Sequence, residues 1–188
     1  MKNLLFELSK RSRKGQNQAE FAAAFTVLVV IVMIPLINLA AIPIRAGLAS
    51  ALVKDTVKEL SLSERFSDAV KSVKDDKLSR RLAAIGGVEL TSVALALRIS
   101  KVSDDAQEIL VEKPGAVPAN WLPDGANSPT NVQLILTVEA NISPLLLGAN
   151  LPGKIPGLTV PFAAKLPANA GWENLGRDPQ TGEFYLNE

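Results

Sequence analysis

The chain has 188 residues and a formal net charge of +1 at pH 7, which leaves room for one modest domain beside any membrane segment. It contains neither histidine nor cysteine, so Ser-His-Asp and Cys-His catalysis, the usual zinc sites and disulfide bonds are excluded. We therefore expect no metal and no cofactor, and a fold that relies on its hydrophobic core or on neighbouring subunits.

The first predicted element is a basic leader, residues 1–15. The leader ends in a basic cluster directly before Gly15, which contains Lys10, Arg11, Arg13 and Lys14. Positive residues that flank a membrane span stay on the cytoplasmic side. We expect the leader to be cytoplasmic and the C-terminal part of the chain to be extracytoplasmic.

Residues 16–60 are predicted to form a transmembrane and stem helix. Within them, residues 21–44 carry no charge and a single amide, Asn38. About 20 apolar residues suffice to cross a bilayer core, which predicts a single-pass protein of the cytoplasmic (inner) membrane. The apolar run exceeds the roughly 7–15 residues of a cleaved signal peptide. Small residues beyond it leave cleavage by signal peptidase as an alternative.

The helical pattern continues past the span to about Leu60, which would give a rod about 60 Å long at 1.5 Å per residue. Pro43 and Gly47 should bend or weaken this helix, so two separate helices that meet at Pro43 are the alternative. Pro35 frees a backbone carbonyl near mid-membrane, and that group must be satisfied locally or by a neighbour.

Glu20 is the acidic residue at the start of the span. An ionised carboxylate at the edge of hydrocarbon is costly unless it is paired or near the interface, so it is a functional candidate. The simpler interpretation places it among the lipid headgroups, where a negative charge favours the start of a helix. Its spacing from Gly15 and its neighbour Phe21 favour a more specific role.

Gly15, Gln16, Glu20 and Phe21, between a short basic leader and an apolar span, resemble the type IV prepilin processing motif. In that family a membrane aspartyl peptidase cuts after the glycine on the cytoplasmic face. The resemblance implies that Gln16 becomes the first residue of the mature chain. It also implies that Glu20 pairs with the new amino group of a neighbouring subunit, a way in which buried charges persist. The best-known pilins carry Phe where this chain has Gln16, a departure that bears on methylation of the new amine.

The Glu-Phe pair, the Gly-Gln start and a span that holds Pro35 look like the TadE-like pseudopilins of tight-adherence (Tad) secretion systems. The resemblance implies a minor pilin or pseudopilin that takes part in assembly or priming of an adhesive type IV pilus. Its implied partners are the membrane, the prepilin peptidase, other pilin or pseudopilin subunits and the Tad assembly machinery. The alternative is an uncleaved, single-pass, signal-anchored protein whose extracytoplasmic part binds an envelope ligand.

Cleavage after Gly15 would remove five basic residues and one acidic residue, a loss of four positive charges, so the net charge would fall from +1 to −3. No basic surface would then remain to favour nucleic acid.

Residues 61–188 are predicted to form an extracytoplasmic α+β head with Pro/Gly-rich loops. The run from Ser61 to Glu64 has the pattern of a capping box that opens a second helix, and Gly86-Gly87 should end that helix. Alternating apolar and polar residues predict a small antiparallel sheet. Its expected strands cover residues 93–100 and 132–142, and a long loop covers residues 113–129. The resemblance to the TadE-like pseudopilins implies a third strand over residues 158–162.

The remaining polar candidates in the head are acidic. Asp75-Asp76 and Asp104-Asp105 leave carboxylate chemistry formally open, but adjacent acids in polar segments are usually solvated faces or turns, so we expect no catalytic residue and no enzyme. Asp178 and Glu183 do not have the spacing of an EF-hand loop, and a plain Asp-Pro-Gln-Thr-Gly turn is favoured. Three C-terminal aromatic residues would form a partner contact if they were exposed: Trp172, Phe184 and Tyr185.

Overall fold

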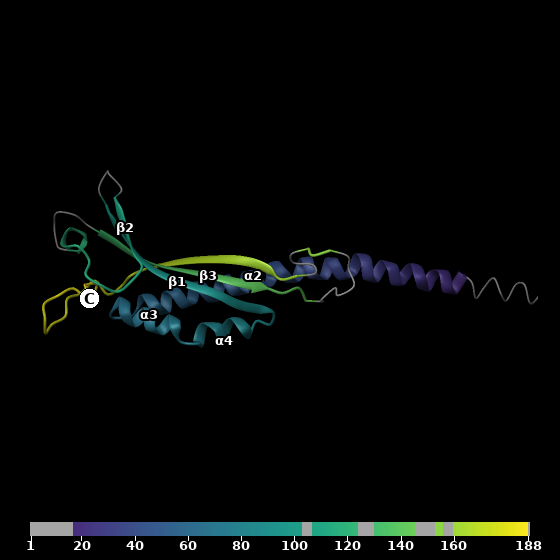
Figure 1. The fold of residues 1–188 in the computed structure, drawn as a ribbon, viewed down its shortest axis with the longest axis horizontal. Helices are drawn as coiled ribbons and strands as arrows, with labels where there is room; N and C mark the ends of the chain where they lie inside the picture. Colours follow the sequence, from purple (N-terminus) through teal and green to yellow (C-terminus); the bar gives the residue numbers. More distant parts are fainter. Residues whose placement is uncertain (1–16, 103–106, 124–129, 146–152, 156–159, 188) are drawn as a thin grey trace, which may run out of the picture.

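The computed structural model describes residues 17–102, 107–123, 130–145, 153–155 and 160–187. Over these ranges a long N-terminal helix leads into a head of short helices and a four-stranded antiparallel sheet (Figure 1). This arrangement confirms the predicted α+β class.

The N-terminal helix runs from Asn17 to Ser61 without interruption, over 45 residues, and is therefore about 68 Å long. It contains a π-helical segment, η1 (Val29–Met33), followed by α2 (Ile34–Ser61). Pro43 lies inside α2. The prediction of one rod is thus confirmed, and the alternative of two helices that meet at Pro43 is wrong.

The π-helical segment lies directly before Pro35 and has a physical relation to it. Proline has no N–H, and its ring clashes with the carbonyl four residues earlier in an α-helix, which here belongs to Ile31. Ile31 lies within η1, where the hydrogen-bonding pattern differs from that of an α-helix. The helix therefore accommodates Pro35 by a local change of helical type and does not break.

The predicted capping box after the stem is wrong. Ser61 is the last residue of α2 and its hydroxyl donates to the Lys58 carbonyl at 2.9 Å, so it belongs to the preceding helix. Two short helices follow in place of one, α3 (Phe66–Lys74) and α4 (Lys77–Ala83). They are separated because Asp75 has extended backbone, with φ −66° and ψ 141°.

The sheet has the strand order β2-β1-β3-β4. Its long central strands, β1 (Val88–Lys101) and β3 (Thr130–Ile142), pair antiparallel as predicted. A short strand that was not predicted, β2 (Glu108–Val111), pairs with β1. The last strand, β4 (Phe162–Gly171), starts where the predicted strand over residues 158–162 was expected to end, which corrects its position.

A bulge in β1 keeps its apolar side chains on one face. Val88 and Leu90 pair with Ile142 and Ala140 of β3, and the register then shifts between Leu90 and Ser92. An extra residue changes which side chains point inward, because successive side chains alternate between the two faces. The apolar residues of β1 beyond the bulge therefore share the inner face with those before it: Val93, Leu95, Leu97 and Ile99.

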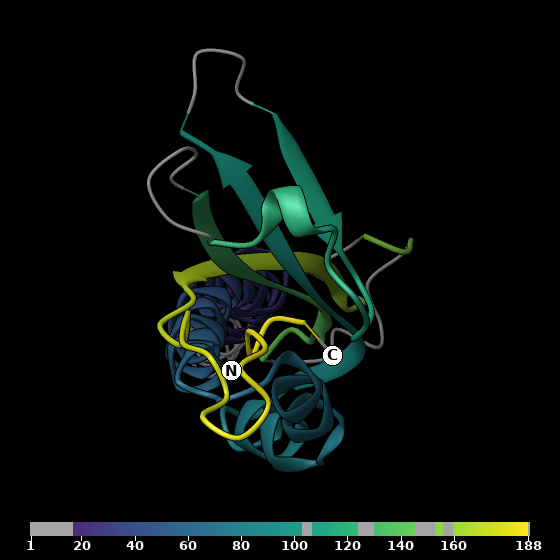
Figure 2. The same ribbon diagram turned by 90° about the vertical axis from the view of Figure 1, so that its left-hand side faces the viewer.

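The helices cover one face of the sheet, so the head has two layers (Figure 2). The end-on view places α2 beneath β4, with α3 and α4 beside it. Fully buried side chains from both layers form one core, which positions the C-terminal half of α2 firmly against the sheet. They include Val53 and Val57 of α2, Phe66 of α3, Leu82 of α4, Leu97 and Ile99 of β1, and Leu134, Leu136 and Ile142 of β3.

Arg45 joins the stem to the head at the end of the core that faces the N-terminus. Its Nη1 donates to the carbonyl of Ser143 at 2.5 Å. The N–H of Ser143 in turn donates to the Gly87 carbonyl at 2.7 Å. A side chain at Gly87 would collide with this arrangement, because its Cβ would lie 2.7 Å from Nη1 of Arg45. The sequence Gly86-Gly87 therefore both turns the chain into β1 and makes room for the guanidinium.

We expect Gly87→Ala to destabilise the head more than Gly86→Ala. Both glycines have positive φ, 71° and 79°, so both alanines carry similar backbone strain, and only the alanine at position 87 meets Arg45. Displacing the guanidinium would break its hydrogen bond to the Ser143 carbonyl, and a hydrogen bond to a charged group contributes about 1.5–3 kcal/mol. Thermal unfolding in detergent measures the difference as a lower Tm for Gly87→Ala.

The control is the same pair of alanines in an Arg45→Met background, where their costs should become equal. Equal costs in the presence of Arg45 would contradict the role assigned to this joint.

Candidate functional site

The candidate assembly residues lie in the first turns of the long helix. Glu20 and Phe21 follow the helix start at Asn17 by three and four residues, and both side chains are exposed. The expected processing residues, Gly15 and Gln16, lie outside the described residues. The sequence motif is thus described only in its second half, at the point where the apolar surface begins.

An aromatic pair marks that beginning. The rings of Phe21 and Phe25 stack with centroids 6.3 Å apart and an interplanar angle of 17°, as expected for two residues one helical turn apart. Phe21 is nevertheless 73% exposed. Large apolar surface of this kind on a protein marks a contact with a partner or a membrane.

Exposed apolar side chains continue from this pair on all sides of the helix. A helix that is apolar all round belongs in a core or in a membrane, and the described part of the head does not enclose this one. The helix is long and apolar enough to cross a bilayer. Its exposed large apolar residues before Asn38 are Phe21, Phe25, Val27, Leu28, Val30, Ile31, Val32, Met33, Leu36 and Ile37.

Asn38 is the point along the helix where cover by the head begins. Its side chain is fully buried, with 0% exposure. The inward positions that follow, Ile42 and Ala46, pack against the core, and Ala49 belongs to it. The helix therefore has an uncovered N-terminal part, residues 17–37, and a part that the head covers on one side.

A cluster of charged side chains lies between α2 and α4, and the sequence analysis did not predict it. Glu59 of α2 forms ion pairs with Lys77 and, at 3.4 Å, with Arg81. These residues border a cavity of about 230 Å³ together with Ser72 and Asp75. The cations are partnered by Glu59, so the cluster fastens α4 to the stem helix. Sequence spacing carries no signal for it, because 18 residues separate Glu59 from Lys77.

The pKa of the Glu59 carboxylate is lowered at this position. Its hydrogen bond from Lys77 lowers the pKa below the ordinary value of 4.5, the nearby charges of Lys77 and Arg81 act in the same direction, and partial burial opposes them. The side chain is still half exposed, so solvent screens the pairs and their contribution to stability is small, about 0–1 kcal/mol each.

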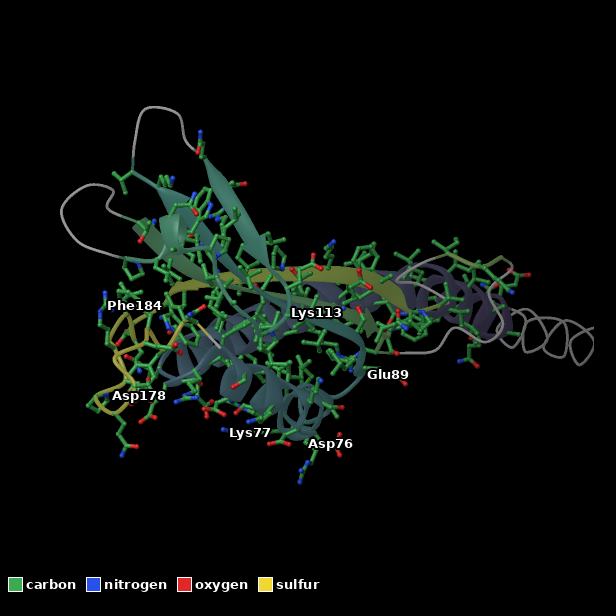
Figure 3. The ribbon with its side chains drawn as sticks, turned by 60° about the vertical axis from the view of Figure 1, so that its left-hand side comes forward. Asp76, Lys77, Glu89, Lys113, Asp178 and Phe184 are labelled. Carbon is green, nitrogen blue, oxygen red and sulfur yellow. The ribbon has the colours of Figure 1, made fainter. Side chains whose placement is uncertain are left out.

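Of the other acidic candidates, the structure describes Asp75 and Asp76. Asp75 and Asp76 are exposed at the break between α3 and α4, on the helical side of the head where Figure 3 labels Asp76. Asp104 and Asp105 lie outside the described residues. Within the described ranges, no three His, Cys, Asp or Glu side chains gather in a way that could hold a metal ion.

Asp178 forms the turn that its sequence predicts. Its Oδ1 accepts from the Gln180 N–H at 2.8 Å, and its carbonyl accepts from the Gly182 N–H at 2.7 Å. Its Oδ2 forms an ion pair with Nη2 of Arg65 at 3.1 Å. The carboxylate therefore holds the C-terminal loop, which Figure 3 marks with Asp178 and Phe184, against the head.

The alternative use of the C-terminal aromatic residues as an exposed partner contact is wrong. Trp172 and Phe184 are buried, and Tyr185 is half-buried. The indole N–H of Trp172 donates to the Asn174 carbonyl at 2.9 Å. These rings close one end of the hydrophobic core.

Comparison with known protein families, with curated proteins and with solved structures found no match to this chain. Its candidate function therefore rests on the residues and geometry described above.

We expect Glu59→Gln to lower stability by up to about 1 kcal/mol at neutral pH, because it removes two screened ion pairs. The pKa of Glu59 is lowered in the folded state, so its contribution is fully present above pH 4.5 and is lost as the pH falls below that value. Urea unfolding at pH 7 and pH 3 measures this as a gap between variant and parent that closes in acid.

The exposed Asp55→Asn variant on the same helix is the control, and we expect it to change stability little at either pH. A gap for Glu59→Gln that persists at pH 3 would show that the carboxylate acts through packing and not through its charge.

Proposed function

We propose that this chain is a minor pilin or pseudopilin of TadE-like type that takes part in assembly or priming of a Tad-type adhesive pilus. It is inserted as a prepilin in the cytoplasmic membrane, with its basic leader inside and its head outside. A prepilin peptidase cuts it after Gly15. Its function depends on helix packing and not on catalysis.

The observation that carries this proposal is the position of Glu20 on the helix. A single acidic residue, near the helix start at Asn17, immediately precedes a run of exposed apolar side chains that the described head leaves uncovered. Lipid covers such a surface in the membrane, and helices of neighbouring subunits cover it in an assembly. The continuous rod from Asn17 to Ser61 supports both uses, because it carries the head on a rigid stem.

Charge pairing gives Glu20 its proposed role. Cleavage after Gly15 leaves a positive α-amino group four residues before Glu20, beside the apolar surface. When helices pack side by side, the carboxylate of one subunit neutralises the amine of the next. An unpaired charge in that position costs about 3–5 kcal/mol, so correct pairing fixes how far one subunit slides along another.

The orientation of the chain follows from its flanking charges. Lys10, Arg11, Arg13 and Lys14 precede the span, and the positive-inside rule keeps them in the cytoplasm. The same orientation places the leader on the side of the membrane where prepilin peptidase cuts and the head on the side where a pilus grows.

Glu20→Ala should be processed normally and should assemble poorly. The cut lies five residues before Glu20, whereas the loss of the carboxylate leaves the neighbour's amine without its partner. At about 3–5 kcal/mol per unpaired charge, we expect at least tenfold fewer surface pili. The measurement combines the mass of the membrane-bound chain with pilus counts in a Tad-bearing host that lacks its own copy.

Asp55→Ala provides the matched control, because Asp55 is an exposed acid on the same helix but beyond the span. It should leave pilus number unchanged. Normal piliation by Glu20→Ala would count against the pairing role, and an uncut parent chain would favour the signal-anchored binding protein instead.

A further inference from the structure

Three exposed apolar side chains of the head lie at the end that faces the uncovered helix. They are Leu145, after β3, Ile155 in the β3–β4 connection, and Phe162 at the start of β4. We call these three residues the rim. None of them is needed for the core, and Leu145 is 54% exposed.

Hydrogen bonds and strand pairing fix where the rim lies. Phe162 pairs with Ile142 at the end of β3. The next residue, Ser143, accepts the bond from Arg45 of α2. The N–H of Val160 donates to the Ile155 carbonyl at 3.3 Å, which ties Ile155 to the start of β4. The rim is therefore level with Arg45 or closer to the N-terminus.

The length of the apolar segment places this level relative to a bilayer. With Glu20 at the cytoplasmic edge of the hydrocarbon, Asn38 lies about 27 Å along the helix, and Arg45 about 38 Å, at 1.5 Å per residue. The hydrocarbon core is about 30 Å thick. Asn38 is thus still at hydrocarbon depth on the far side, and Arg45 is among the headgroups.

The burial of Asn38 requires protein at that depth. A single helix surrounded by lipid would leave the Asn38 amide accessible, yet its exposure is 0%. Polar groups at membrane depth are tolerated where protein covers them. Protein therefore covers this side of the helix below the level of the headgroups.

The charges around the rim fit the same level. Lys154 is exposed beside Ile155, and Arg45 is already bound to the head. Cations beside apolar side chains are typical of segments that lie in the membrane interface, where they contact phosphate groups.

We propose that the rim inserts into the extracytoplasmic leaflet of the bilayer, with its apolar side chains at the boundary between headgroups and acyl chains. The occupant of this surface is phospholipid. The inference rests on the membrane span proposed above but not on pilus assembly. Insertion holds the head at a fixed height and tilt over the membrane before the helix leaves it.

The absence of cysteine in the chain allows single-cysteine reporters. We would label Leu145→Cys and Ile155→Cys in the full chain with an environment-sensitive nitrobenzoxadiazole dye, in nanodiscs that hold one copy in phosphatidylcholine and phosphatidylglycerol. Leu110→Cys is the matched control, because Leu110 of β2 is also 54% exposed but lies at the other end of the head. Val30→Cys reports on the span itself.

Lipids that carry a shallow doxyl group should quench the labels at 145 and 155 at least about twofold, as expected for interfacial insertion, and should leave the label at 110 nearly unquenched. Lipids that carry a deep doxyl group should quench the label at 30, which lies about 15 Å from the edge of the hydrocarbon. Deep quenching at 30 without shallow quenching at 145 and 155 would overturn this inference alone. No quenching at 30 would overturn the span as well. The third outcome is a change in the fluorescence of the label at 145 that occurs only with two copies per disc and without quenching by doxyl lipids. It would assign the surface to a second copy and overturn the proposal.

Discussion

The structure depends on one constraint, which is that the apolar helix before Asn38 must be covered from outside the described head. Ten large apolar side chains are exposed there, and burial of each stabilises by about 1.5–3 kcal/mol relative to water. The total exceeds about 10 kcal/mol, which is comparable to the whole stability of a domain. In the proposed function a bilayer supplies this cover to a single subunit, and packed neighbouring helices supply it in an assembly.

Continuity of the helix makes the covered and uncovered parts act together. The same helix that is exposed at Phe21 contributes Val53 and Val57 to the core of the head, and Pro43 does not interrupt it. Arg45 adds a polar joint at the boundary through Ser143 and Gly87. In the proposed membrane or fibre, the depth and rotation of the helix would therefore set the position of the head directly.

Much of this arrangement follows from the sequence, because the stem and the two central strands have strong hydrophobic patterns. The bulge was not predicted, because the expected strand began at residue 93. The sequence does show the change of phase, with Val88 and Leu90 out of step with Val93 and Leu95. Other features depend on tertiary contacts. Strand β4 lacks a strong strand pattern because it contains Pro167 and four alanines. The proline is tolerated because β4 is an edge strand. Helix α2 continues through Ser61, which overrides the capping pattern. Glu20 and Phe21 were placed at the start of the helix by sequence alone, whereas the pairs of Glu59 arise from packing between α2 and α4.

The most direct test of the account is the intact mass and amino-terminal sequence of the protein purified from its native membranes. The account predicts a chain that begins at Gln16 and has lost the mass of residues 1–15. A membrane-bound chain that still begins at Met1 would contradict prepilin processing, and Glu20 would then have no neighbouring α-amino group with which to pair.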